Sequence, residues 1–168
     1  HTNGSLHYFD FGRYHTPEKM GRYRSHHTDP ELILKTMARF GAGYEIENLD
    51  EILLEISNNP STHGTGAMYA SVRSRVDFNK AYKYANDLQQ KGAVNFGPFG
   101  LNSTNCARFA RDILLVAETS KFMRLRLMLP WLITPTTKGN VLNASADGKY
   151  FVVDRTVIER KRKGVFDT

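Results

Sequence analysis

The chain has 168 residues, of which 40% are hydrophobic and 24% charged, as is ordinary for one folded domain with its own core. No apolar run reaches the roughly 18 residues of a membrane span, and a single cysteine excludes an internal disulfide. The net charge of +6 comes with no zinc-knuckle, helix-turn-helix or RNP-like pattern, so we expect no nucleic-acid partner.

The first predicted element is a strand over residues 6–11, which follows an Asn3-Gly4 pair. Asn-Gly beside an extended segment is typical of a two-residue hairpin turn. Because almost nothing precedes that turn, we expect residues 1–168 to form a single domain that lacks an N-terminal strand. The polar residues 12–30 are predicted as a loop.

Residues 32–40 alternate apolar side chains with Lys35 and Arg39, which favours a strand. The preceding Asp29-Pro30 pair would equally suit the start of a helix, so both interpretations stand. We take the strand as the prediction.

Two amphipathic helices are expected in the middle of the chain, capped by Asn48 and Asp77. Glu51 would complete a capping box with Asn48, and Gly92 would close the second helix. A short strand at 67–72 separates the two helices. The apolar face of the second helix consists of Phe78, Ala81, Tyr82, Ala85 and Leu88.

A third helix is predicted over about 105–118. After it, residues 122–133 look extended with an interruption at Pro130, residues 135–143 look like a polar loop, and residues 149–153 form a last strand before a basic tail. Helices and strands do not strictly alternate. The expected fold class is therefore α+β, with a single antiparallel sheet and helices packed on it.

Cys106 falls on the first turn of the third predicted helix. A thiol there feels the positive end of the helix dipole and unpaired backbone N–H groups, and both favour the nucleophilic thiolate. It shares a helix face with Phe109 and Ile113, so it points toward the body of the protein or a cleft in it. The alternative is that the thiol is a small buried hydrophobic group.

A cysteine nucleophile needs a base, and imidazole is the usual one. Among the six histidines, His63 stands apart because it precedes two glycines and a strand, where the backbone allows close approach of a ligand. The alternative for His63 is a turn residue at the end of a strand. His7 lies in the first predicted strand.

Three arginines, Arg13, Arg22 and Arg24, gather in the predicted polar loop. Guanidinium groups bind carboxylates through paired hydrogen bonds, and Tyr14 and Tyr23 add stacking faces. These residues are candidates for binding an anionic group, with a solvated loop as the alternative.

We expect neither a metal nor a cofactor. The adjacent His26 and His27 would point to opposite faces of a strand, and there is no HExxH or paired-cysteine spacing. The segment GPFGLNST lacks the Gly-Lys-Ser/Thr ending of a phosphate-binding loop.

The stretch AYKYANDLQQKGAVNFGPFGLNSTNCARFARDIL resembles the nucleophile region of circularly permuted papain-like proteins. This group includes NlpC/P60 peptidases, lecithin:retinol acyltransferase-like enzymes and PPPDE peptidases. In this group, a helix with alternating alanines and large apolar residues is followed by a loop that commonly has an aromatic residue. The next helix then begins with the pattern Asn-Cys-x-x-Phe. The matching positions are Ala81, Ala85, Phe96, Asn105, Cys106 and Phe109. The segments HYFDFGRY, GRYRSHHTDPEL and HGTGAMYASV also resemble an uncharacterised bacterial family seen mainly in Bacteroidetes.

The resemblance implies that Cys106 is the nucleophile, that the base histidine precedes it on the sheet, and that a third polar residue orients this histidine. His63 fits the role of base by its order in the chain. In the group, however, the histidine commonly sits in the opening hairpin, so the base would alternatively lie upstream of His1. His7 or Asp10 would then orient it.

The resemblance also implies a site that stabilises the oxyanion. Asn105 or backbone N–H groups at the helix start would supply it. Phe96 stands where NlpC/P60 relatives often have a tyrosine, so this position has no oxyanion role and is a candidate for binding substrate.

The predicted function is a thiol hydrolase, of the thiol-protease type, or an acyltransferase that acts on an amide or ester bond. The expected substrate is a peptide, with a cell-wall peptide as one case, or an acyl group. The alternative is a non-catalytic binding module on a papain-like scaffold that recognises an anionic ligand through the arginines. The resemblance implies a soluble bacterial protein, located in the cytoplasm or the cell envelope. The sequence makes no prediction about the oligomeric state.

Overall fold

The computed structural model describes residues 3–62, 66–97, 103–128, 137–145 and 147–164, and it confirms the predicted α+β class. The elements in chain order are β1 (Phe9–Gly12), β2 (Met20–Ser25), the short 3₁₀ helix η1 (Pro30–Leu32), α1 (Leu49–Asn58), β3 (Met68–Ala70), α2 (Phe78–Gln89), β4 (Val94–Phe96), β5 (Ser103–Thr104), α3 (Cys106–Ala117), α4 (Lys121–Met128), α5 (Thr137–Ala144), β6 (Lys149–Asp154) and β7 (Val157–Arg162). No helix within the described ranges is long and apolar enough to cross a membrane.

The first sheet has the strand order β1-β2-β4-β5. β1 and β2 pair antiparallel, with Asp10 opposite Arg24 and Phe11 opposite Tyr23. β2 also pairs antiparallel with β4, whereas β4 and β5 run parallel. Gly21 permits close packing on this sheet, because a Cβ there would lie 2.6 Å from Cζ of Phe11.

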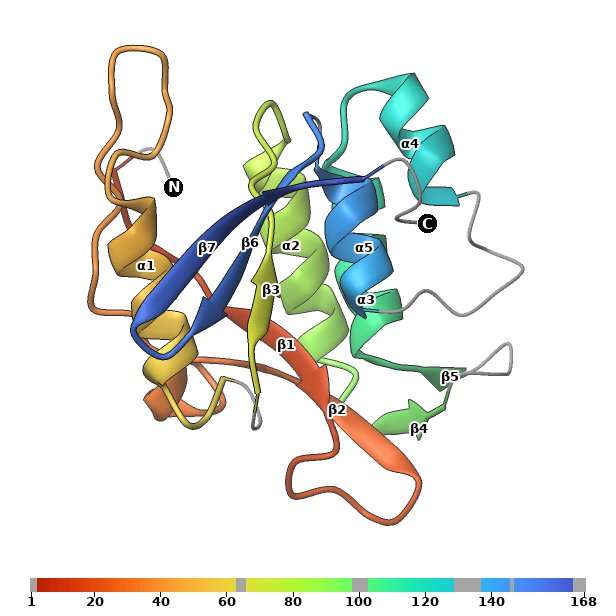
Figure 1. Ribbon diagram of the computed structural model, residues 1–168. Helices are drawn as coiled ribbons and strands as arrows, with labels where there is room; N and C mark the ends of the chain where they lie inside the picture. The colour runs from red at the N-terminus through yellow and green to blue at the C-terminus, as the bar shows by residue number, and fades with distance from the viewer. Residues whose placement is uncertain (1–2, 63–65, 98–102, 129–136, 146, 165–168) are drawn as a thin grey trace.

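A second, antiparallel sheet has the strand order β3-β6-β7. The described strands thus form two sheets where the sequence predicted one. α2 packs on β2, and α3 packs on β1; α5 contacts α3 on one side and β3 and β6 on the other. Figure 1 shows the resulting arrangement, with β1 and β2 below the helices and the second sheet crossing in front of them.

Aromatic rings hold α3 against the first sheet. Phe11, Tyr23, Leu88 and Phe109 form a buried cluster. The ring centroid of Tyr23 lies 4.7 Å from that of Phe11 and 5.3 Å from that of Phe109. Burial of a large apolar side chain contributes roughly 1.5–3 kcal/mol, so this cluster fixes the N-terminal half of α3 on the sheet.

The predicted helix starts are confirmed at α2 and α3. The Asp77 carboxylate accepts a hydrogen bond from the backbone N–H of Lys80 at 3.0 Å, and Oδ1 of Asn105 accepts one from that of Arg108 at 2.9 Å. Each side chain therefore satisfies one of the N–H groups that a helix start leaves unpaired. Gly92 follows α2 with a φ of +70°, which suits a glycine after a helix end.

α1 begins after Asn48, as predicted, but the predicted capping is only partly realised. The Asn48 side-chain oxygen accepts from the backbone N–H of Arg39 at 2.8 Å, so it is not free to cap the helix. Its amide donates to Glu51, the expected partner, at 3.2 Å. Asn48 thus ties the incoming chain to α1.

The prediction of a loop over residues 12–30 is wrong where β2 lies. Arg22 and Arg24 make the segment look solvated, but Arg24 is buried and paired with Asp10 on β1. The ion pair with Asp10 across the two strands hides the Arg24 charge from water, and a count of polar residues misses such pairing.

The prediction of a strand over residues 32–40 is also wrong. The backbone N–H groups of Lys35 and Thr36 donate to the Glu55 carboxylate, at 2.6 and 2.9 Å, rather than to a neighbouring strand. The Asn3-Gly4 turn packs on this segment, because the Gly4 carbonyl accepts from the N–H of Ala38 at 2.8 Å.

Three further differences lie in the C-terminal part. Residues 121–128 form the helix α4 and not an extended segment, with Met123 and Leu127 buried at helical spacing. The predicted loop contains α5, and the basic tail continues as β7, paired with β6. The predicted strands at the start of the chain, after residue 66 and after residue 148 are confirmed as β1, β3 and β6.

Candidate functional site

Cys106 is the first residue of α3, and its side chain is exposed. β5, paired with β4, delivers the chain to this position, and the Asn105 cap starts the helix. Backbone N–H groups of the first helical turn have no partner in the helix and carry partial positive charge. The exposure of Cys106 excludes the alternative of a buried hydrophobic group.

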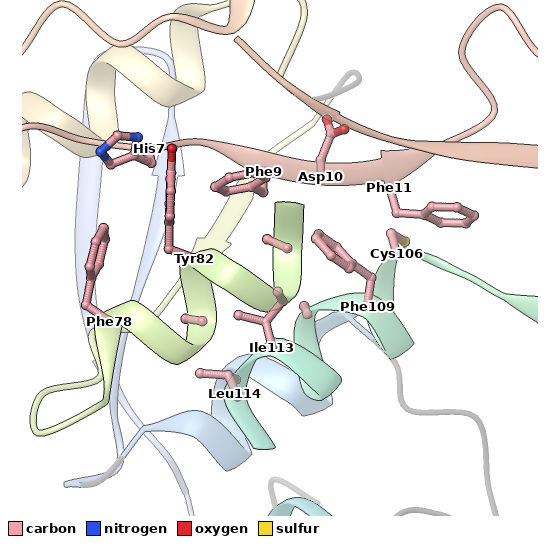
Figure 2. A pocket seen from close by; sticks show the side chains of 13 residues that line it. His7, Phe9, Asp10, Phe11, Phe78, Tyr82, Cys106, Phe109, Ile113 and Leu114 are labelled. Carbon is pink, nitrogen blue, oxygen red and sulfur yellow. The ribbon is translucent and has the colours of Figure 1, made fainter. Parts of the chain in front are cut away.

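Cys106 lies at one end of a groove of about 520 Å³ between β1, α2 and α3 (Figure 2). The volume falls within the range of small-molecule sites, roughly 300–1,000 Å³. Most of the wall is aromatic or aliphatic. β1 contributes Phe9 and Phe11, α2 contributes Phe78 and Tyr82, and α3 contributes Phe109 and Ile113.

The strand β1 presents its side chains to two different faces. His7, Phe9 and Phe11 face the helices and the groove, whereas the Asp10 carboxylate points away from the helices (Figure 2). On that far side Asp10 receives two hydrogen bonds from Arg24, at 2.9 and 2.5 Å. Asp10 is thereby held in an ion pair rather than beside an imidazole.

His7 lies at the opposite end of the groove from Cys106 (Figure 2). Its ring centroid is 4.9 Å from that of Tyr82 and 5.8 Å from that of Phe78. Nδ1 of His7 is buried without a hydrogen-bond partner among the described residues. Burial lowers the pKa of His7 below its ordinary value, and repulsion from His26 lowers it further. The structure therefore brings His7 to the groove but does not bring it to the thiol.

His63, the histidine that the sequence favoured as base, lies outside the described residues. The other alternative, a histidine upstream of His1, lies outside the chain.

Two arginines of the predicted binding loop are engaged within the protein. Arg22 donates two hydrogen bonds to Asp29, at 2.9 and 2.5 Å, and Nε of Arg22 donates to the Tyr14 carbonyl at 2.8 Å. Arg24 holds Asp10 and stacks on the Tyr14 ring, with Cζ 3.4 Å from the centroid. Their guanidinium groups thus serve the fold of β1 and β2.

The remaining predicted binding residues lie near one another on the first sheet. Arg13 is exposed, with Cζ 5.9 Å from the ring centroid of Phe96. Phe96 stacks on Phe11 at 5.9 Å, and Tyr23 is buried in the core cluster. Arg13 is accordingly the predicted binding arginine that the structure leaves facing solvent.

Sequence reasoning identified the apolar face of α2 but not its role. The sequence placed Phe78 and Tyr82 on the apolar face of a helix, and in the structure both line the groove. The signal that could have found this is the pair of small residues, Ala81 and Ala85, between the large rings on the same face. Small side chains on α2, together with Ala110 on α3, leave space for a groove between the two helices.

No three histidine, cysteine, aspartate or glutamate side chains gather as a metal site in the described part of the chain. A family model described as type VI secretion system effector TseH-like matches residues 1–123, which include β1, α2 and Cys106. The match is consistent with the papain-like resemblance and carries no specific activity. No curated protein and no solved structure matches the chain. Since the family model spans well over half of its length, the chain belongs to the TseH-like family of type VI secretion system effectors.

Proposed function

We propose that the protein is a papain-like thiol hydrolase or acyltransferase in which Cys106 attacks an amide or ester carbonyl. The observation that carries the proposal is the position of the thiol: exposed, on the first turn of α3 and at the end of a groove of ligand size. A helix start favours the thiolate, and the thiolate is the reactive form.

In the proposed reaction, a bond forms between Sγ of Cys106 and the carbonyl carbon. Backbone N–H groups at the start of α3 stabilise the oxyanion, and Asn105 holds that start in place. A histidine takes the thiol proton and gives it to the leaving amine or alcohol, and we assign this role to His63. Water then releases the acyl group.

Membership in an effector family supports a further part of the proposal, that a type VI secretion system exports the protein. It also supports the papain-like assignment over an unrelated scaffold that happens to have a helix-start cysteine.

A second candidate function is a binding module on the same scaffold. The separation of His7 and Cys106 at the two ends of the groove favours it, because His7, the histidine that lines the groove among the described residues, does not lie beside the thiol as a base would. Recognition of an anionic ligand by Arg22 and Arg24 would require that they leave Asp29 and Asp10.

The test measures turnover of cell-wall peptides and acyl esters by wild type, Cys106→Ala, His63→Gln and His7→Gln. Loss of the nucleophile or the base should lower kcat by at least about a thousandfold. We expect this loss in Cys106→Ala and His63→Gln, and near wild-type rates in His7→Gln.

Equal rates in Cys106→Ala and wild type, on every substrate that wild type turns over, would reject the thiol mechanism. So would a thiol that iodoacetamide does not modify at neutral pH. An alkylated thiol without turnover of any substrate would support the binding module instead.

A further inference from the structure

The polar groups of the Cys106 groove lie at its two ends. One end has the thiol of Cys106, and the other has the imidazole of His7 and the hydroxyl of Tyr82 (Figure 2). The carboxylate of Asp10 is engaged with Arg24 on the far face of β1. Among the described residues, the side chains that line the groove between these two ends are apolar apart from Asp10, whose carboxylate is turned toward Arg24.

The middle of the groove is shaped by side chains of very different sizes. The large side chains of Phe9, Phe109 and Ile113 and the small side chains of Ala81 and Ala110 all line it. The result is a long apolar space that ends at a nucleophilic atom.

The mostly apolar side chains of this lining offer an extended peptide few hydrogen-bond partners. Each of its residues carries an N–H and a C=O group, and both need partners when buried. A hydrocarbon chain has no such groups, and it gains from burial in proportion to its length.

We infer that the groove binds the hydrocarbon chain of a fatty-acyl ester and places the acyl carbonyl beside Sγ of Cys106. The inference deepens the proposed function and rests on it for the role of the thiol. The Sγ–acyl bond would form as the ester C–O bond breaks and the alcohol leaves with a proton; water would then release the fatty acid.

The test uses N-alkyl iodoacetamides, which need no catalytic base beyond the thiolate. The S–C bond forms as the C–I bond breaks and iodide leaves. Because the chain has one cysteine, the mass gain of the whole protein reports Cys106 alone. Each methylene moved from water into an apolar site is worth up to about fourfold in affinity. N-octyl iodoacetamide should therefore alkylate wild type at least about tenfold faster than N-methyl iodoacetamide, after correction for their rates with free cysteine.

Variants that fill the groove should remove the chain-length preference. Ala110→Trp and Ala81→Trp each place a large ring in the apolar space, and Ala42→Trp places the same ring at an exposed position outside it. We expect equal rates for the two reagents in the first two variants and the wild-type preference in Ala42→Trp. Circular dichroism checks that each variant is folded, and two filling variants guard against misfolding of one.

Equal rates for both reagents in wild type would overturn the inference, and so would a preference that persists in a folded filling variant. If sedimentation shows that wild type forms dimers and that Ala110→Trp does not, the groove binds a second copy of the chain instead. A chain-length preference without Cys106-dependent turnover would reject the proposed function and keep the groove assignment. Cys106-dependent turnover of esters at rates independent of acyl chain length would keep the proposed function and reject the assignment of the groove to a hydrocarbon chain.

Discussion

His7 shows how the surroundings of one residue decide its protonation. Its ring is packed against Tyr82 and Phe78, and Nδ1 is buried without a partner among the described residues. Charging a ring in such a place costs hydration that no acceptor replaces, so the neutral form is favoured. His7 therefore enters the groove as a neutral group at pH 7.

Nuclear magnetic resonance should show that His7 titrates below the ordinary histidine pKa of about 6.5, because burial lowers its pKa. Between the folded-state pKa and about 6.5, the unfolded chain binds the proton more readily than the folded protein. The free energy of unfolding should consequently fall as pH drops below about 6.5 and level off below the folded-state pKa.

Urea unfolding at a series of pH values checks the second part of this prediction. His7→Gln cannot take up the proton, so its stability should depend less on pH in this window than that of wild type. A His7 midpoint at or above 6.5 would contradict the packing described for its ring.

At the scale of elements, α3 couples the site to the core. Its first residue is Cys106, its first turn is capped by Asn105, and Phe109 one turn later is buried against Tyr23. The same short segment thus aims the thiol, exposes the N–H groups of the helix start and anchors both to the first sheet. Changes in the cap should act on stability and on reactivity together.

Asn105→Ala should lower the free energy of unfolding by about 1 kcal/mol, because it removes the acceptor for the Arg108 N–H. Asn105→Asp keeps an acceptor oxygen but loses the side-chain amide donor, so it should retain stability. If backbone N–H groups hold the oxyanion, as proposed, Asn105→Asp should also retain turnover.

Chemical denaturation and steady-state kinetics on the two Asn105 variants separate these roles. A stable Asn105→Asp variant with kcat reduced by about 10²–10³ would show that the side-chain amide itself contacts the oxyanion. That result would replace the backbone groups in the proposed mechanism.

At the scale of the whole molecule, Arg24 joins segments that are distant in the sequence. From β2 it donates to Asp10 on β1 and to the Ser61 carbonyl, 2.8 Å away, in the segment that follows α1. The Tyr14 ring covers the guanidinium, and Arg24 as a whole is 3% exposed. One buried side chain therefore connects the first hairpin to the chain that leads toward the second sheet.

Arg24→Ala should destabilise the protein by about 3 kcal/mol, because it removes the charged partner of Asp10, which keeps only the Tyr8 hydroxyl as a side-chain donor among the described residues, and the Arg24 donor of the Ser61 carbonyl. Arg39→Ala is the matched control, since Arg39 forms its ion pair with Glu51 on the surface. The control should unfold at the wild-type denaturant concentration, because exposed ion pairs contribute little. Equal effects of the two substitutions would show that the Arg24 cluster is not a structural tie.

The sequence predicted most reliably those features that depend on residues close together in the chain. Asp77 and Asn105 mark the starts of α2 and α3 because a cap depends only on residues within one helical turn. For the same reason the sequence by itself placed Cys106 on the first turn of a helix. It also determined the α+β class, since the apolar periodicities of the main helices and strands are written in short segments.

Two features were decided only by the tertiary structure: which residues share the groove with the Cys106 thiol, and which polar segments form strands. β2 and β7 carry charged side chains, and each becomes a strand by pairing with the strand before it, β1 or β6. In the groove, Phe11 and not His7 lies near Cys106, and α2 and α3 form an apolar groove with β1. The groove depends on contacts between residues far apart in the chain, and no window of local sequence contains those contacts.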